Sequence, residues 1–344
     1  MNGFLTEIKN NFLATGVGSL PFQEPRSAVN FVFDTFSYHV PFWPQLPKRS
    51  FYENMYVQFC ENLPGLMTDE TRKTVMVDTQ QESYVGALEE CFNKCQAADV
   101  DYFAISPSHA QGLHLFVQRL TGLNWQGWVK AQVIGPLSLG LSLLDEKKKP
   151  ILYNAELAEL LPLFLSLKAS WLIKQIKVHT NTKVIIFIDE PFFVAVGTNA
   201  CPLPREEIVE MINCVVRAIH ENGALAGLHC CGNTDWEMVM STDIDILNFD
   251  AYGYLDKVLL YEKPLKKFLS KGCMPAIGIV PNNDDLLQNR LTERLLQTLR
   301  KQPRLWGNGA LITTSCGCSA LSENLTRRAG ALCVEIAEKL KMEF

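Results

Sequence analysis

The sequence has no long run of charge and no long run of apolar residues. Its densest basic cluster is the triplet Lys147, Lys148 and Lys149, which is typical of a solvated loop, and its formal net charge is only -5. A nucleic-acid-binding surface needs many more basic residues than this along one face. Residues 160–167 form an apolar stretch, but Pro162 interrupts it and Lys168 follows it, whereas a membrane span needs about 20 apolar residues. We therefore expect neither nucleic acid nor a membrane as a partner.

The chain also lacks the features of a secreted protein. It begins Met1-Asn2-Gly3, without the basic and then apolar segments of a signal peptide. Its 11 cysteines are spread over 344 residues, unlike the dense disulfide framework of a small secreted domain. Several of them, such as Cys91 and Cys333, fall within helical apolar patterns and are expected to be buried, reduced side chains. These observations predict a cytoplasmic protein.

Apolar, strand-like segments alternate with helical patterns along the whole chain. No linker or internal repeat divides the 344 residues, so we expect a single catalytic domain over residues 1–344. Short apolar runs separated by helices are typical of buried parallel strands in an α/β fold. Eight such strands are predicted, at residues 12–20, 100–106, 129–134, 183–189, 224–230, 244–249, 274–280 and 310–315. Eight repeats of strand and helix predict a closed (β/α)₈ TIM barrel.

An open, doubly wound sheet is the alternative fold. It has no reason to stop at eight strands, and no Gly-x-Gly-x-x-Gly follows the first strand to mark a dinucleotide site. Between the first two predicted strands, residues 38–80 form a lid-like insertion. Residues 41–55 of this insertion are rich in proline and aromatic side chains, and they are interpreted either as a docking surface or as a cover for the barrel mouth.

Soft metal ligands occur at the ends of two predicted strands. Side chains alternate along a strand, so His229 and Cys231 are expected on one face and Cys230 on the other. Active sites of these barrels lie at the carboxyl ends of the strands, where Cys316 would approach His229 and Cys231. Imidazole and thiolate are preferred zinc ligands, and three of them leave a fourth position open. The alternative is a hydrogen-bonded histidine beside inert buried cysteines, and the spacing leaves the role of Cys318 undecided.

These residues also carry a resemblance to a known group of enzymes. The run Leu228-His229-Cys230-Cys231-Gly232-Asn233 resembles the His-x-Cys-Gly-Asn zinc motif of corrinoid-dependent thiol methyltransferases. Further segments occur in the same order as in the catalytic domain of cobalamin-independent methionine synthase, at residues 15–21, 134–136, 188–191, 248–250 and 315–317. The resemblance spans nearly the whole chain. It corresponds to the short "core" form of that enzyme, within the superfamily that also contains uroporphyrinogen decarboxylase.

The resemblance implies roles for individual residues. His229, Cys231 and Cys316 fall on zinc ligands, and Asp250 falls where a glutamate of the methionine synthases also ligates zinc. Asp189 matches the catalytic aspartate that holds the amino group of homocysteine. Ser19 matches the part that holds the carboxylate. Glu190 is predicted to bind substrate beside Asp189, and the alternative for this pair is a helix cap or a salt-bridged loop.

The resemblance further implies a reaction. It predicts a zinc-dependent transferase that moves a methyl group to a small-molecule thiol, homocysteine above all, to give methionine. The chain lacks the second barrel that binds the folate donor in full-length methionine synthases. A methylated corrinoid, either free methylcobalamin or a corrinoid protein, is therefore the expected donor. Two alternatives stay open: a metal-independent decarboxylase of the uroporphyrinogen type, and a non-catalytic corrinoid- or zinc-binding protein.

Overall fold

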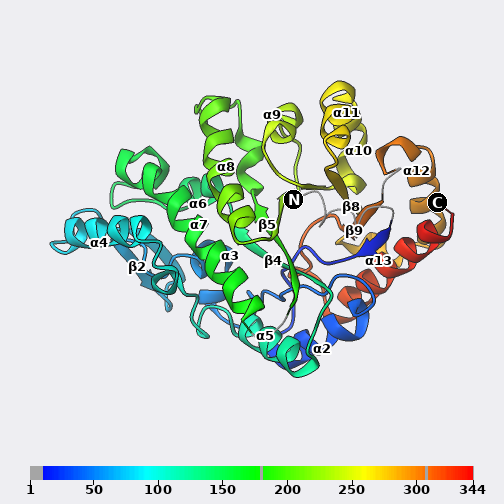
Figure 1. Ribbon diagram of the computed structural model, residues 1–344, viewed down its shortest axis with the longest axis horizontal. Coiled ribbons are helices and arrows are strands. Elements are labelled where there is room, and N and C mark those ends of the chain that lie inside the picture. The colour runs from blue at the N-terminus through cyan, green and yellow to red at the C-terminus, as the bar shows by residue number, and fades with distance from the viewer. Residues whose placement is uncertain (1–10, 179–180, 307–308, 344) are drawn as a thin grey trace.

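The computed structural model describes residues 11–178, 181–306 and 309–343, and its centre is a curled parallel β-sheet (Figure 1). Seven strands lie side by side in the order β1-β9-β8-β7-β6-β5-β4. Their bounds are Phe12–Ala14 (β1), Trp128–Ile134 (β4), Lys183–Asp189 (β5), Leu225–Cys230 (β6), Ile246–Phe249 (β7), Met274–Val280 (β8) and Ala310–Thr314 (β9). Nearly every residue of β4 to β9 is buried, as expected for parallel strands covered by crossover helices. The predicted α/β class is confirmed.

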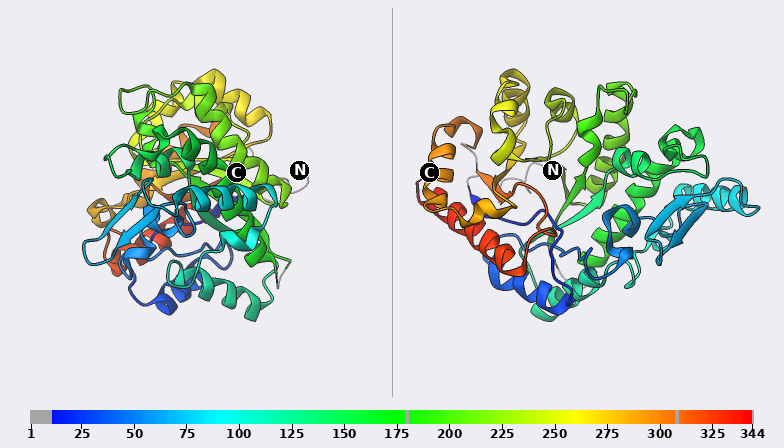
Figure 2. Two further views of the ribbon diagram at one scale, coloured as in Figure 1. Left: turned by 90° about the vertical axis from the view of Figure 1, so that its left-hand side faces the viewer. Right: turned by 180° about the vertical axis from the view of Figure 1, so that it is seen from behind.

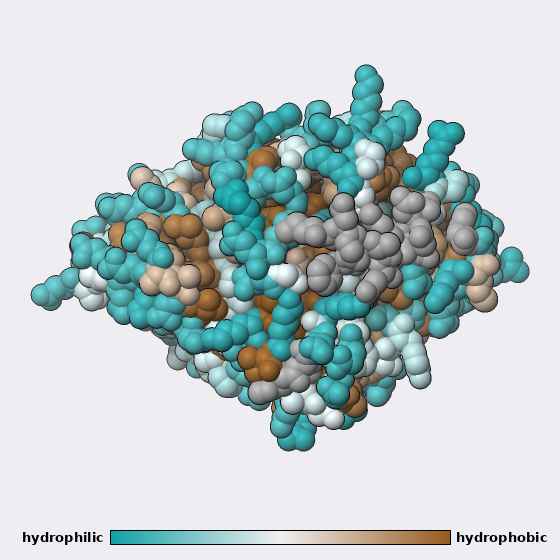
Figure 3. Space-filling view, in the orientation of Figure 1, coloured by the Kyte–Doolittle hydropathy of each residue, from teal (hydrophilic) through white to brown (hydrophobic). Residues whose placement is uncertain are grey.

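Helices surround this sheet, as the views in Figure 2 show. The longer ones are Pro25–Phe36 (α2), Tyr84–Gln96 (α4), Gln111–Leu123 (α5), Ala155–Lys177 (α7), Arg205–Glu221 (α8), Ala251–Leu259 (α10), Glu262–Ser270 (α11), Leu291–Arg300 (α12) and Glu323–Glu343 (α13). Two shorter helices, Pro136–Ser142 (α6) and Trp236–Ser241 (α9), follow the ends of β4 and β6. No helix in the described ranges is long and apolar enough to span a membrane. Hydrophilic residues predominate on the face shown in Figure 3.

The prediction of a strand at residues 100–106 is wrong. This segment begins with a 3-10 helix, Val100–Phe103. The buried ammonium group of Lys168 donates hydrogen bonds to the carbonyl oxygens of Glu61 and Ala104, at 2.9 and 3.4 Å, and so ties the end of this turn to residue 61 and to α7. An apolar run of this length does not distinguish a strand from a buried turn, which explains the error.

Residues 40–45 lie between β1 and β4 instead. The Val40 amide donates to the Ala14 carbonyl at 3.1 Å, and the Trp43 amide donates to the Lys130 carbonyl at 2.9 Å. Val40 is fully buried and packs with side chains of the strands. Pro41 and Pro44 have no amide hydrogen, so this segment does not form a regular ladder. The sheet is therefore a curled array of seven strands, and a complete eight-stranded barrel is not confirmed.

Residues 51–77 contain further short elements that the sequence did not predict. A 3-10 helix, Phe51–Glu53, is followed by α3, Met55–Gln58, and by an antiparallel hairpin of β2, Leu66–Asp69, and β3, Thr74–Val77. In Figure 1 the hairpin and α4 lie at the end of the molecule opposite α12 and α13. The aromatic rings of Phe42 and Trp43 are buried, so these two rings do not form part of a docking surface. A lid-like motion of residues 38–80 stays a prediction.

Candidate metal centre and cavity

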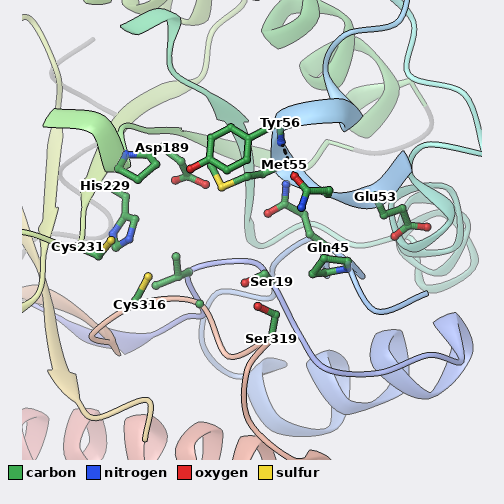
Figure 4. A pocket seen from close by; sticks show the side chains of 15 residues that line it. Ser19, Gln45, Glu53, Met55, Tyr56, Asp189, His229, Cys231, Cys316 and Ser319 are labelled. Carbon is green, nitrogen blue, oxygen red and sulfur yellow. Dashed lines mark hydrogen bonds between the residues drawn. The ribbon is translucent and has the colours of Figure 1, made fainter. Parts of the chain in front are cut away.

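The three predicted soft ligands come together at the carboxyl ends of β6 and β9. The ligand atoms of His229, Cys231 and Cys316 all lie within 4.8 Å of one another (Figure 4). Cys230 points away, as alternation along β6 predicts: it is fully buried, and its Sγ lies 3.4 Å from the Gly232 carbonyl oxygen. The predicted juxtaposition of His229, Cys231 and Cys316 is confirmed. Among the described residues, this is the one group of three or more such side chains close enough to share an ion.

His229 presents one ring nitrogen to this cluster. Its Nδ1 lies 2.5 Å from Oδ1 of Asn248, on β7. Its Nε2 is buried and makes no hydrogen bond of normal geometry to any residue that the structure describes. A buried polar atom without a partner is costly, so this nitrogen fits a bound metal ion well.

The electrostatics of the cluster also suit a metal. Contact with the Cys316 thiol, and then with His229, lowers the pKa of Cys231 to about 4, so this sulfur is a thiolate near neutral pH. The same contact raises the pKa of Cys316 far above its usual value, since a second negative charge beside the first is unfavourable. Burial alone would lower the pKa of His229, but Cys231 and Asp189 together raise it. One cation would neutralise the charges that these groups cannot carry side by side, and a nitrogen with two sulfurs is a donor set that zinc prefers.

Asp189 ends β5 beside the cluster. Its side chain is only 8% exposed, and Oδ1 has no hydrogen-bond partner among the described residues. Burial raises the pKa of this carboxyl to about 6, against the opposing attraction of Lys130. Lys130 is fully buried on β4, donates to Oε1 of Gln132 at 3.0 Å and to the Val17 carbonyl, and has its pKa lowered by burial to about 8. Asp189 thus offers an unpaired acceptor to a ligand.

The cluster and Asp189 line a cavity of about 220 Å³. Side chains from residues 45–56, which contain only short helical turns, complete its wall, as Figure 4 shows. These residues are Gln45, Pro47, Glu53, Asn54, Met55 and Tyr56. Ser19, predicted to hold a carboxylate, also lines the cavity, together with Gly317 and Ser319. Gly317 leaves the room that Ser19 occupies, because a Cβ at Gly317 would lie 2.0 Å from the Ser19 hydroxyl oxygen.

Glu53 holds this irregular wall in place. Its buried carboxylate accepts hydrogen bonds from the amides of Leu46 and Gln111, at 3.1 and 3.2 Å, and forms an ion pair with Arg49 at 2.5 Å. Gln45 donates to Oε1 of Gln58 at 2.7 Å. Sequence reasoning missed Gln45, Met55 and Tyr56, since no periodic pattern marks which residues of such a segment face inward. The density of aromatic and proline residues was the one available signal.

Three other candidate residues lie outside the cluster. Glu190 is fully buried but does not line the cavity: its carboxylate accepts from the amides of Leu137 and Ser138, at 3.0 and 2.9 Å, and so caps α6. Burial raises its pKa to about 8. Cys318 is buried beside Thr314, with its Sγ 3.9 Å from Oγ1, and does not belong to the cluster. The helix-cap alternative thus describes Glu190 better than substrate binding does.

Asp250 caps a helix as well. Its Oδ1 accepts from the Gly253 amide at 2.7 Å, at the start of α10, and the residue is not part of the three-ligand cluster. Burial raises its pKa, and the Cys231 thiolate adds to this effect. Ligation of a metal by Asp250 stays a prediction.

Comparisons with solved structures show a related fold. A putative vitamin-B12 independent methionine synthase from Listeria monocytogenes has a TM-score of 0.51 and 12% sequence identity, over 96% of this chain and 98% of that chain. A B12-independent methionine synthase from Shewanella sp. W3-18-1, in complex with selenomethionine, has a TM-score of 0.48 and 19% identity, over 66% of this chain and 67% of that chain. No family model matches the sequence, and the search of curated proteins found no match. At such identities, the Listeria structure supports the fold alone.

Proposed function

We propose that this protein is a zinc-dependent methyltransferase that moves a methyl group from a methylated corrinoid to a thiol, with homocysteine as the acceptor and methionine as the product. The observation that carries this proposal is the cluster of His229, Cys231 and Cys316 in a cavity beside the unpaired carboxylate of Asp189. The fold likeness to a putative methionine synthase agrees with it. Cytoplasmic location is part of the same proposal.

In this proposal, one group of residues binds the thiol end of the acceptor through zinc, and another group binds its amino and carboxylate groups. His229, Cys231 and Cys316 would hold the zinc ion. When bound, zinc supplies Lewis acidity, which lowers the pKa of a thiol so that the nucleophilic thiolate forms at neutral pH. At the other end, Asp189 is ionised above a pH of about 6 and would accept hydrogen bonds from an ammonium group. Ser19 and the backbone beside it would hold a carboxylate.

The wall of the cavity argues against a decarboxylase. A substrate with several carboxylates needs cationic side chains to bind them. Neither lysine nor arginine occurs among the described residues that line the cavity, whereas Asp189 and Glu53 do. The cavity therefore favours an acceptor with a positive group over a polyanion. A metal-independent decarboxylase remains the weaker proposal.

The methyl donor is inferred from the resemblance and from chemistry rather than from a binding site. A methylated corrinoid would react with a thiolate without folate, and it could be free methylcobalamin or a corrinoid protein. Because the rings of Phe42 and Trp43 are buried, a protein donor would have to contact other residues around the cavity mouth.

A thiol methylation assay tests this proposal directly. Zinc-loaded protein is incubated with methylcobalamin and either homocysteine or coenzyme M, and the methylated products are quantified. We expect methionine to form, and much less methylated coenzyme M, since its sulfonate would face Asp189. Stoichiometric zinc without any thiol methylation would favour a non-catalytic zinc-binding protein. Methylation by metal-free protein at the same rate would refute the zinc dependence.

A further inference from the structure

Asn248 lies directly beside His229 in the sheet, and its side chain is completely buried. Its amide joins four neighbouring strands. Oδ1 lies 2.5 Å from Nδ1 of His229, and Nδ2 donates to the Ala276 carbonyl at 2.8 Å and to Oγ1 of Thr313 at 3.0 Å.

The two hydrogen bonds of Nδ2 determine which way the amide faces. The Ala276 carbonyl can only accept, so a flipped amide would place two oxygens about 2.8 Å apart. The hydroxyl hydrogen of Thr313 is already donated to the Thr314 carbonyl, at 2.9 Å, so Oγ1 of Thr313 also acts as an acceptor towards Asn248. Oδ1 of Asn248 must therefore face His229.

An amide oxygen can only accept, which makes Nδ1 of His229 the donor. In a neutral imidazole, only one ring nitrogen carries a hydrogen, so Nε2 retains its lone pair. Nε2 is buried without a hydrogen-bond partner among the described residues, and His229 lines the cavity together with Cys231 and Cys316. The direction of a hydrogen-bond chain through four strands thus decides which nitrogen is free to ligate.

We propose that Asn248 is a positioning residue that holds His229 in the Nδ1–H tautomer and so keeps the Nε2 lone pair available for a metal ion. The inference rests on the proposed zinc-dependent function and deepens it. The sequence drew attention to Asp250 in the same short segment, but Asp250 caps α10, and the contact with a cluster residue comes from Asn248, two positions earlier. Partners of this kind typically affect metal affinity by about 10- to 100-fold.

The tautomer can be measured without any metal. Metal-stripped protein with ¹⁵N-labelled histidine is studied by NMR at alkaline pH, where the imidazole is neutral, and the His229 signals are assigned by their loss in His229→Gln. We expect the Nδ1–H tautomer. The Nε2–H tautomer in the wild-type protein would overturn the inference, whatever the behaviour of any variant.

A variant and a matched control give a second readout. Asn248→Leu keeps the branch at Cγ and the number of side-chain heavy atoms but removes the acceptor, and we expect mixed tautomers of His229 and a zinc affinity about 10- to 100-fold weaker, measured by competition with a chromophoric chelator. Asn213→Leu is the control, because Asn213 is also nearly buried and accepts from the Asp243 amide at 2.9 Å, but it lies on α8 and does not line the cavity. We expect unchanged zinc affinity for this control.

The two proposals can fail separately. A folded Asn248→Leu protein with the wild-type tautomer and unchanged zinc affinity would overturn the role of Asn248 alone. A wild-type protein that shows the Nδ1–H tautomer but binds no zinc would refute the proposed function, and the hydrogen-bond chain would still be correct.

Discussion

The cavity has two walls that are built in different ways. One wall consists of the ends of regular strands: Asp189 and His229 are paired in the ladder of the sheet, and Cys316 follows the end of β9. The other consists of residues 45–56, which have little regular structure and are held by side-chain contacts such as those of Glu53. In the proposed function, the strand ends would bind the metal and the charged end of the acceptor, while the irregular wall would shape the remaining space.

Loss of a ligand on the strand-end wall should have the largest effect. We expect Cys231→Ser to weaken zinc binding by more than the roughly 100-fold limit typical of outer-shell partners, and to abolish thiol methylation. Cys230→Ala is the matched control, since this neighbouring thiol points to the opposite face. Metal content and methylation are measured for both proteins. Equal zinc content in the two variants would contradict the assignment of Cys231.

Asp189→Asn should separate acceptor binding from metal binding on the same wall. The side chain would lose a charge-assisted hydrogen bond to the acceptor, so kcat/KM should fall about 10- to 100-fold with zinc content unchanged. In the wild type, methylation should decline as the pH falls below about 6, where Asp189 becomes protonated. Initial rates across this pH range test the expectation. A wild-type profile that stays flat through pH 6 would argue against a role for the carboxylate.

The same substitution should stabilise the fold at neutral pH. The folded pKa of Asp189 is raised from 3.8 to about 6, so the native state holds the proton longer than the unfolded state does, and the free energy of unfolding falls as the pH rises between these values. Asp189→Asn would remove this cost above pH 6, less whatever the attraction between Asp189 and the buried Lys130 contributes. Urea unfolding at pH 5 and pH 8 measures it. A variant less stable than the wild type at pH 8 would show that the buried charge is well compensated.

The residues of the strand-end wall could be predicted from the sequence better than those of the irregular wall. Strands β4 to β9 were predicted to within one or two residues, because buried parallel strands are continuous apolar runs, and alternation placed His229 and Cys231 together. The error at residues 100–106 and the missed segment at residues 40–45 have one cause. Tertiary contacts of Lys168, Val40 and Trp43 determine these conformations, and local sequence carries no signal of contacts so far along the chain.

Disruption of the irregular wall should affect the acceptor and spare the metal. Glu53→Ala removes the acceptor for two buried amides and the partner of Arg49, which should lower the free energy of unfolding by about 2 to 3 kcal/mol and raise KM. Urea unfolding, KM and zinc content are measured together. Zinc loss from a folded variant would show that the two walls are not separate.

The smallest effect is expected at Tyr56. Its ring lines the cavity beside Met55, and Tyr56→Leu should weaken acceptor binding by about 1 kcal/mol, or roughly fivefold in KM, through lost apolar contact. Tyr56→Phe keeps the ring and serves as the control. If Tyr56→Phe reduced the rate as strongly as Tyr56→Leu, the hydroxyl rather than the shape of the wall would matter.

X-ray absorption at the zinc edge tests the central claim most directly. On zinc-loaded wild-type protein, the account predicts one zinc ion per chain with two protein sulfurs and an imidazole nitrogen, from Cys231, Cys316 and His229. In Cys316→Ser, any zinc that remains should have one protein sulfur. Zinc surrounded by oxygen and nitrogen alone, or two sulfurs retained in Cys316→Ser, would contradict the account.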